Sequence, residues 1–160
     1  YRREVERFVE AEVGPQASRL ETEIVRRQGE ATLVNQLGVL YARYGLNDKA
    51  EAQFQRILKT REYMPALINL GNLSFLRGDW PQTLAFYQRA QSMDPRNSSA
   101  LLGSVRALRE MGREQAAAEA FGKLETVAPD LAQRFAYLGS TGGSRAAETD
   151  ADKGVVIWYE

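Results

Sequence analysis

The groups best suited to chemistry in this sequence are amides, guanidinium groups and aromatic rings, because two reactive residue types are missing. The chain has 160 residues and contains no cysteine and no histidine. Without cysteine there is no thiolate ligand or thiol nucleophile, and without histidine there is no imidazole base, proton shuttle or ligand. The composition therefore predicts a protein that is not an enzyme and that needs no metal or cofactor.

Two pairs of polar side chains have spacings that suit ligand binding. Asn69 and Asn72 are three residues apart, which places them on one face of a helix. An amide both donates and accepts hydrogen bonds, so this pair could bind the backbone of an extended peptide, or both could be ordinary polar surface residues. Arg106 and Arg109 could clamp a carboxylate through bidentate hydrogen bonds, or they could be solvated surface charge.

The elements that position these groups are revealed by an internal repeat of 33 or 34 residues. Anchors at Gly38, Gly71, Val105 and Gly139 are spaced by 33, 34 and 34 residues. Seven residues after the first three anchors come glycines, and sixteen after come aromatic residues: Gly45, Gly78 and Gly112, then Phe54, Tyr87 and Phe121. We expect each of these glycines to end a helix in the left-handed conformation. The repeat predicts pairs of antiparallel helices.

Further residues predict where the second helix of each pair begins and ends. Asp48 and Asp79 lie where a carboxylate would cap the start of that helix. Pro95 and Pro129 are expected to end it, because the residue before proline is disfavoured in the α conformation.

These columns resemble the tetratricopeptide repeat (TPR), whose pattern runs W-x₂-L-G-x₂-Y, then A-x₃-F, then P. The first unit has Val34, Leu37, Gly38, Tyr41, Ala50 and Phe54 at the matching positions. The later units depart from the pattern at Ser74, Thr83 and Ser104. The resemblance implies an all-α, right-handed superhelical solenoid of antiparallel helix pairs. It also implies a non-catalytic scaffold that binds a peptide segment of a partner protein in its concave groove.

The resemblance also implies which side chains line that groove, on the first helix of each repeat. They are Asn35, Val39, Arg43, Asn69, Asn72, Leu76, Leu102, Arg106 and Arg109. Chaperone-binding members of the family hold a C-terminal carboxylate with a set of lysine, asparagine and arginine residues. Here Asn35 and Val39 stand at two of those positions and only Asn69 matches. We therefore do not expect a chaperone tail as the ligand.

The expected organisation has three parts. Residues 1–30 form an N-terminal helical hairpin, broken at Gly14-Pro15, or a degenerate repeat. Residues 31–139 form three repeats, 31–63, 64–97 and 98–131, followed by a closing helix at 132–139. Residues 140–160 form a flexible linker and a strand-like tail.

The tail is the least expected feature of a helical chain. Residues 155–159 read Val-Val-Ile-Trp-Tyr, a composition typical of a β-strand. An isolated strand is not stable in water, so the segment should dock on something. It could lie in the groove of its own or a neighbouring copy, pair with a strand of a partner or following domain, or merely be the place where the chain was cut. In the first two cases Ile157, Trp158 and Tyr159 are its anchors.

The charge balance and the hydropathy of the sequence argue against nucleic acid as a partner and against a membrane span. The chain has 21 basic and 21 acidic residues, a balance that argues against a nucleic-acid surface. It has no apolar run long enough to span a membrane, so we expect a soluble protein, cytoplasmic or extracytoplasmic.

The sequence begins at Tyr1, which suggests a processed or excised piece of a longer polypeptide. Asp150-x-Asp152-x-Gly154 lacks the remaining ligands of a calcium loop.

The function predicted from these observations is protein binding without catalysis. The competing hypothesis is a homo-oligomerisation module, in which the C-terminal tail of one copy docks on a neighbouring copy.

Overall fold

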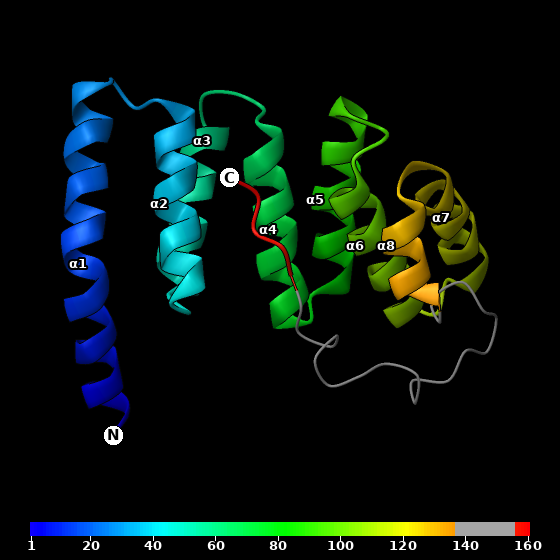
Figure 1. Ribbon diagram of the computed structural model, residues 1–160, viewed down its shortest axis with the longest axis horizontal. Helices are drawn as coiled ribbons and strands as arrows, with labels where there is room; N and C mark the ends of the chain where they lie inside the picture. The colour runs from blue at the N-terminus through cyan, green and yellow to red at the C-terminus, as the bar shows by residue number, and fades with distance from the viewer. Residues whose placement is uncertain (137–155) are drawn as a thin grey trace. The chain divides into compact units, whose positions relative to one another are not determined.

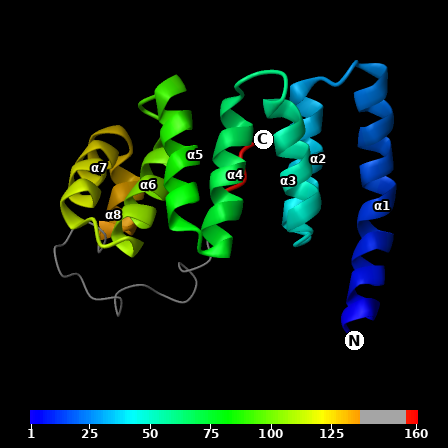
Figure 2. The same cartoon turned by 180° about the vertical axis from the view of Figure 1, so that it is seen from behind.

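The computed structural model describes residues 1–136 and 156–160, and in these residues the fold is all-α (Figures 1 and 2). The helices are α1 (Arg2–Arg26), α2 (Ala31–Arg43), α3 (Asn47–Leu58), α4 (Met64–Arg77), α5 (Trp80–Met93), α6 (Ser98–Glu110), α7 (Glu114–Val127) and α8 (Pro129–Arg134). The chain forms two compact units. Unit 1 comprises Tyr1–Asn69 with Tyr159–Glu160, and unit 2 comprises Leu70–Trp158. The boundary between them falls within α4.

Unit 1 is built around α2, which packs against both α1 and α3. Leu37 and Phe54, the leucine and the aromatic of the first repeat, are fully buried. A Cβ atom added at Gly38 would overlap the ring of Phe54, so only glycine allows this ring to approach the α2 backbone. Gly45 follows the end of α2 with a φ of 72° and confirms the predicted glycine turn.

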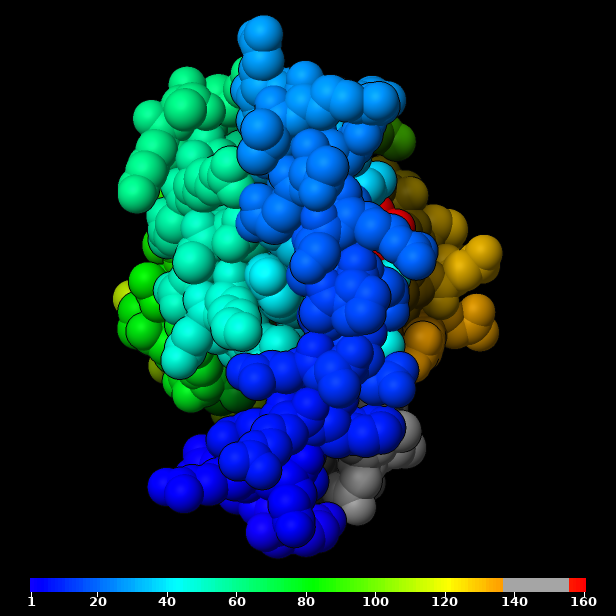
Figure 3. Space-filling view, turned by 90° about the vertical axis from the view of Figure 1, so that its left-hand side faces the viewer, coloured from blue at the N-terminus to red at the C-terminus, as the bar shows by residue number. Residues whose placement is uncertain are grey.

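The helical hairpin predicted for residues 1–30 is wrong, because α1 continues through Pro15 as a single helix. Proline removes one backbone donor, which leaves the carbonyl of Ala11 without its helical partner. Both residues are exposed, so water can satisfy that carbonyl. Figure 3 shows α1 in blue on the surface of unit 1, beside α3. Val13, Ala17 and Ile24 are its buried residues.

Unit 2 contains the second part of α4 and the helices α5 to α8. Its core includes a buried cluster on α6, α7 and the residues that follow: Leu101, Leu102, Val105, Phe121, Leu124, Ala132 and Phe135. Gly78 and Gly112 have φ values of 74° and 71°, as the repeat predicts. Asp79 caps α5, because its carboxylate accepts a hydrogen bond of 3.1 Å from the Gln82 N–H.

The two prolines also confirm the predicted helix ends. Pro95 follows α5, and Pro129 follows α7, where it starts α8. The closing helix is therefore earlier and shorter than the predicted 132–139, because proline at the first helical position costs no hydrogen bond. Residues 137–139 lie outside the described residues.

Candidate peptide-binding site

Three asparagines of the predicted groove are buried inside the fold. Asn35 lies on α2, and Asn69 and Asn72 lie on α4, with exposed fractions of 0%, 0% and 4%. The alternative that Asn69 and Asn72 are ordinary surface residues is therefore wrong. A buried amide is destabilising unless its donors and acceptor are paired, so the partners of these side chains define the site.

In unit 1 the amides of Asn35 and Asn69 surround the main chain of Tyr159. The Tyr159 N–H donates to Asn69 Oδ1 at 2.8 Å, and the Tyr159 carbonyl accepts from Asn69 Nδ2 at 2.8 Å. Asn35 Nδ2 donates to the same carbonyl at 2.8 Å. Asn69 Nδ2 also donates to Asn35 Oδ1 at 3.0 Å, which fixes both amides in the required orientation. Both main-chain groups of one residue are thus bonded by side chains.

An ion pair lies beside this network. Arg43, at the end of α2, contacts the side-chain carboxylate of Glu160 at 2.6 Å. Their side chains are 56% and 50% exposed, so solvent screening limits the pair to about 0.2–1 kcal/mol. Val39, predicted to line the groove, has no exposed surface and belongs to the core of unit 1.

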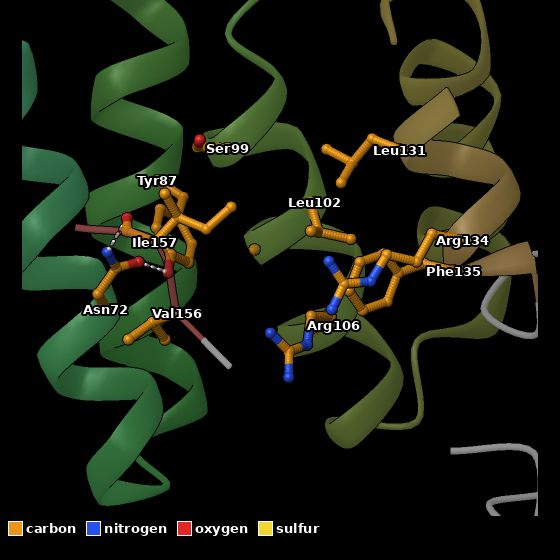
Figure 4. Close-up of a pocket in the computed structure, with 11 residues that line it drawn as sticks. Asn72, Tyr87, Ser99, Leu102, Arg106, Leu131, Arg134, Phe135, Val156 and Ile157 are labelled. Carbon is orange, nitrogen blue, oxygen red and sulfur yellow. Dashed lines mark hydrogen bonds between the residues drawn. The ribbon is translucent and has the colours of Figure 1, made fainter. Parts of the chain in front are cut away.

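In unit 2 the amide of Asn72 holds the next part of the tail (Figure 4). Asn72 Nδ2 donates to the Ile157 carbonyl at 2.9 Å. The Tyr87 hydroxyl donates to Asn72 Oδ1 at 2.5 Å, which directs the amide nitrogen toward the tail. Burial raises the pKa of Tyr87 well above its usual value despite the nearby Arg106. The hydroxyl therefore stays protonated and can act as the donor at neutral pH.

A small pocket lies beside Ile157 in unit 2 (Figure 4). Its volume is roughly 40 Å³, and its walls include Leu102, Leu131, Phe135 and Arg106. Arg106 is only 6% exposed, and its guanidinium carbon lies 4.1 Å from the centroid of the Phe75 ring. Solvated surface charge is therefore the wrong description of Arg106. Its cation lies against an aromatic face and adjoins the pocket.

The two remaining predicted groove residues are more open to solvent. Leu76, near the end of α4, is 41% exposed. Arg109 lies one turn after Arg106 on α6 and is partly buried. Their contact with a partner stays a prediction.

The strand predicted for the tail is absent from residues 156–160, while Val155 lies outside the described residues. A strand requires a neighbouring backbone, whereas the partners here are side-chain amides on helices. The carbonyl of Ile157 accepts from Asn72 in unit 2, and the carbonyl of Tyr159 accepts from Asn69 in unit 1. Ile157 is 57% exposed, and Trp158 and Tyr159 are partly buried. The contacts to the chain's own amides are thus made mainly by the tail's backbone.

Two features of the site were missed by sequence reasoning. Asn35 and Asn69 are 34 residues apart, one repeat, and this recurrence of an amide could have indicated that they act together. The hydroxyl of Tyr87 has no such signal, because the aromatic column of the repeat predicts only packing. In residues 1–136 and 156–160 no group of three or more acidic side chains is arranged to hold a metal ion. Asp150, Asp152 and Gly154 lie outside those ranges.

The structure thus combines helical hairpins with buried amides that hydrogen-bond to the main chain of Ile157 and Tyr159. Comparison with solved structures shows which known proteins share this fold. The structure of MamA matches with a TM-score of 0.66 and 17% identity, covering 84% of each chain. The structure described as "YrrB: a TPR protein with an unusual peptide-binding site" matches with a TM-score of 0.68 and 18% identity, covering 91% of this chain and 74% of that one. The chain therefore has the fold of these structures, one of which is described as a TPR protein, and this fold confirms the resemblance seen in its sequence.

Sequence comparison adds one curated relative. Anaphase-promoting complex subunit 3 of Schizosaccharomyces pombe is 30% identical over 104 residues. The match covers 64% of this chain and only 16% of that subunit. No family model matches the chain. Among the described helices, none is both long and apolar enough to cross a membrane.

Proposed function

We propose that this protein is an interaction scaffold, rather than an enzyme, that binds an extended segment of a partner protein through Asn35 and Asn69 in unit 1, and that Asn72 in unit 2 contributes a separate contact. The observation that carries the proposal is the pairing of Asn69 with both the N–H and the carbonyl of Tyr159. The tail thus serves as an example of the ligand.

The energetics favour a site that is filled. Asn35 and Asn69 are fully buried, so a segment that leaves the site takes away partners that these amides use. Water can replace these partners once the segment has left, so each hydrogen bond of the bound segment contributes about 0.5–1.5 kcal/mol. Because the bonded groups are main-chain atoms, extended segments of many sequences can supply them. Side chains that meet Arg43 or the pocket beside Ile157 can then add selectivity.

The tail makes these contacts within its own chain, so a partner has to compete with it. Docking of a tethered segment is intramolecular and needs no second molecule. A partner therefore binds with an affinity reduced by the fraction of molecules in which the tail occupies the site. The fraction of molecules whose site is free of the tail, together with the chemistry of the site, determines how strongly the scaffold binds a partner.

A peptide with the sequence of residues 155–160, labelled with fluorescein at its N-terminus, tests the proposal. Its binding is measured by anisotropy to the intact chain and to a chain with Tyr159→Pro, which removes the tail N–H that donates to Asn69. We expect saturable binding that is tighter to the variant. Adding Asn69→Ala should weaken binding by about ten-fold or more, since several hydrogen bonds are lost.

Two further variants make the result specific. Asn47→Ala is the matched control, because Asn47 begins α3 and the same amide is removed there. Asn69→Asp retains the shape and the acceptor but loses the donors, and it should also weaken binding. Equal binding to the Asn69 and Asn47 variants, with unchanged circular dichroism, would show that the amides are not the peptide site.

Homo-oligomerisation is the alternative, because a neighbouring copy offers the same tail sequence to the same amides. Light scattering of the intact chain over a range of concentrations separates the two. A dimer that Tyr159→Pro dissociates would favour assembly through the tail. A monomer at all concentrations would exclude it.

A further inference from the structure

The tail specifies what kind of segment this site prefers, in addition to being extended. We infer that the preferred ligand has a residue with a free backbone N–H, and therefore not proline, followed directly by an acidic residue. This inference rests on the proposed function and concerns the same site. It is carried by the contacts of Tyr159 and Glu160 in unit 1.

The first requirement comes from Asn69. Its Oδ1 atom accepts the Tyr159 N–H at 2.8 Å while its Nδ2 atom donates to the Tyr159 carbonyl at 2.8 Å. The orientation of this amide is fixed by its bond to Asn35, so Oδ1 cannot rotate away to find another donor without losing that bond. A residue without an N–H would leave a buried acceptor unpaired. Proline is therefore excluded at this position.

The second requirement comes from Arg43. Its guanidinium contacts the carboxylate of the residue that follows Tyr159, and arginine keeps its charge at any physiological pH. An acid at this position is attracted and a base is repelled. Because both groups are about half exposed, the preference is a bias that salt weakens and not an absolute requirement.

Other positions of the segment should be more permissive. The Ile157 side chain is 57% exposed, and its carbonyl is the group that Asn72 bonds. Substitution of the side chain at this position should therefore matter less than the loss of the N–H two residues later.

The experiment compares peptides based on residues 155–160 for binding to the full chain carrying Tyr159→Pro. In one peptide the amide before Tyr159 is replaced by an ester, in which an oxygen atom takes the place of the N–H. In the control the ester precedes Ile157, whose N–H has no acceptor among the described residues. We expect the first ester to weaken binding about ten-fold or more and the second by less than about two-fold.

Charge is tested with peptides carrying Glu160→Gln and Glu160→Lys. At low salt the lysine peptide should bind about two- to five-fold more weakly than the glutamate peptide, with glutamine between them. In a chain that also carries Arg43→Glu the order should reverse, and 0.5 M salt should remove the difference in both chains.

The outcomes separate the inference from the function it rests on. If the peptides bind and Asn69→Ala weakens them, but the two esters bind equally or Arg43→Glu leaves the order unchanged, the ligand specification is wrong and the peptide site stands. If no peptide binds, or Asn69→Ala has no effect, the proposed function fails and this inference fails with it.

Discussion

The ring of Tyr87 packs tightly against the backbone of two glycines in unit 2, so that even one added methyl group would overlap it. A Cβ atom added at Gly71 would lie 2.6 Å from Tyr87 Cε1, and one added at Gly103 would overlap the opposite edge of the ring. The hydroxyl is bonded to Asn72, so the ring cannot swing aside without breaking that bond. The glycines at these positions provide space for the ring and need no unusual backbone conformation.

We therefore predict that Gly103→Ala lowers the free energy of unfolding by about 1–3 kcal/mol, the usual cost of overpacking a core. Gly122→Ala is the matched control, because Gly122 lies on α7 with no atom within 4 Å of an added Cβ. That substitution should stabilise the chain by about 0.5–1 kcal/mol through helix propensity. Urea denaturation measures both. An equal change in the two variants would contradict the packing described for Tyr87.

The hydroxyl of Tyr87 gives a prediction for alkaline pH. Burial raises its pKa above the value of about 10 for an unfolded tyrosine. The folded state therefore favours the protonated form. This contribution is complete below about pH 9 and is lost as the pH rises above about 10, by up to about 1.4 kcal/mol per pH unit.

Tyr87→Phe removes that titration and leaves Asn72 Oδ1 without its donor. Near neutral pH we expect the variant to be less stable by about 1–3 kcal/mol. Between pH 10 and 11 the difference should shrink, because only the unmodified chain loses stability through this group. Urea unfolding at pH 8, 9, 10 and 11 tests this, and parallel curves for the two proteins would contradict it.

At the scale of the helices, α1 contains one residue that destabilises the helical conformation. Pro15 lies inside the helix and cannot donate to the carbonyl of Ala11. We predict that Pro15→Ala raises the free energy of unfolding by about 1–2 kcal/mol, since the restored hydrogen bond outweighs the greater entropy of the unfolded chain.

Hydrogen exchange of the α1 amides, together with urea denaturation, measures this effect. Pro129→Ala is the control, because proline at the start of α8 breaks no helical bond, and it should change stability by less than about 0.5 kcal/mol. If the two variants behave alike, the cost assigned to proline within α1 is wrong.

The helices also show how far the sequence alone could predict this protein. Gly38, Phe54 and Gly45 recur at the repeat period, and each position requires its residue type for a local reason, so the hairpins could be predicted. Gly14-Pro15 predicts a helix break, but α1 continues through Pro15 because this residue is exposed, and exposure cannot be read from the local sequence. The burial of Arg106 depends on Phe75, about thirty residues earlier in the chain, and no local pattern reveals such a contact.

The site was predictable to a similar extent. The amides of Asn35, Asn69 and Asn72 were identified from their position in the repeat, and their capacity to bind extended chain follows from the amide group itself. That the chain's own tail supplies that extended chain was one of several open alternatives. The strand expected at residues 155–159 is absent from the described residues 156–160. A composition rich in β-branched and aromatic residues predicts extended backbone, but it does not predict which groups will bond to its N–H and carbonyl groups.

At the scale of the whole molecule, a segment of the chain occupies the site proposed for a partner, so ligand binding and tail release are linked. A ligand that binds only the folded state stabilises it by RT ln(1 + [L]/Kd). Where the tail already fills the site, the apparent Kd equals the Kd for the free site divided by the fraction of molecules whose site is free. A ligand then adds only the difference between its own stabilisation and that of the tail.

We therefore predict that the peptide of residues 155–160 stabilises the Tyr159→Pro chain more than the unmodified chain. At a concentration about 100 times the Kd for the free site, the variant should gain about 2.7 kcal/mol. The unmodified chain should gain about 1.4 kcal/mol if the tail occupies its site about ten times out of eleven. Urea denaturation with and without peptide measures both gains, and a peptide of scrambled sequence should give neither. Equal gains in the two chains would show that the tail does not occupy the site in solution, and the hydrogen bonds to Tyr159 would then describe a ligand position that is normally empty.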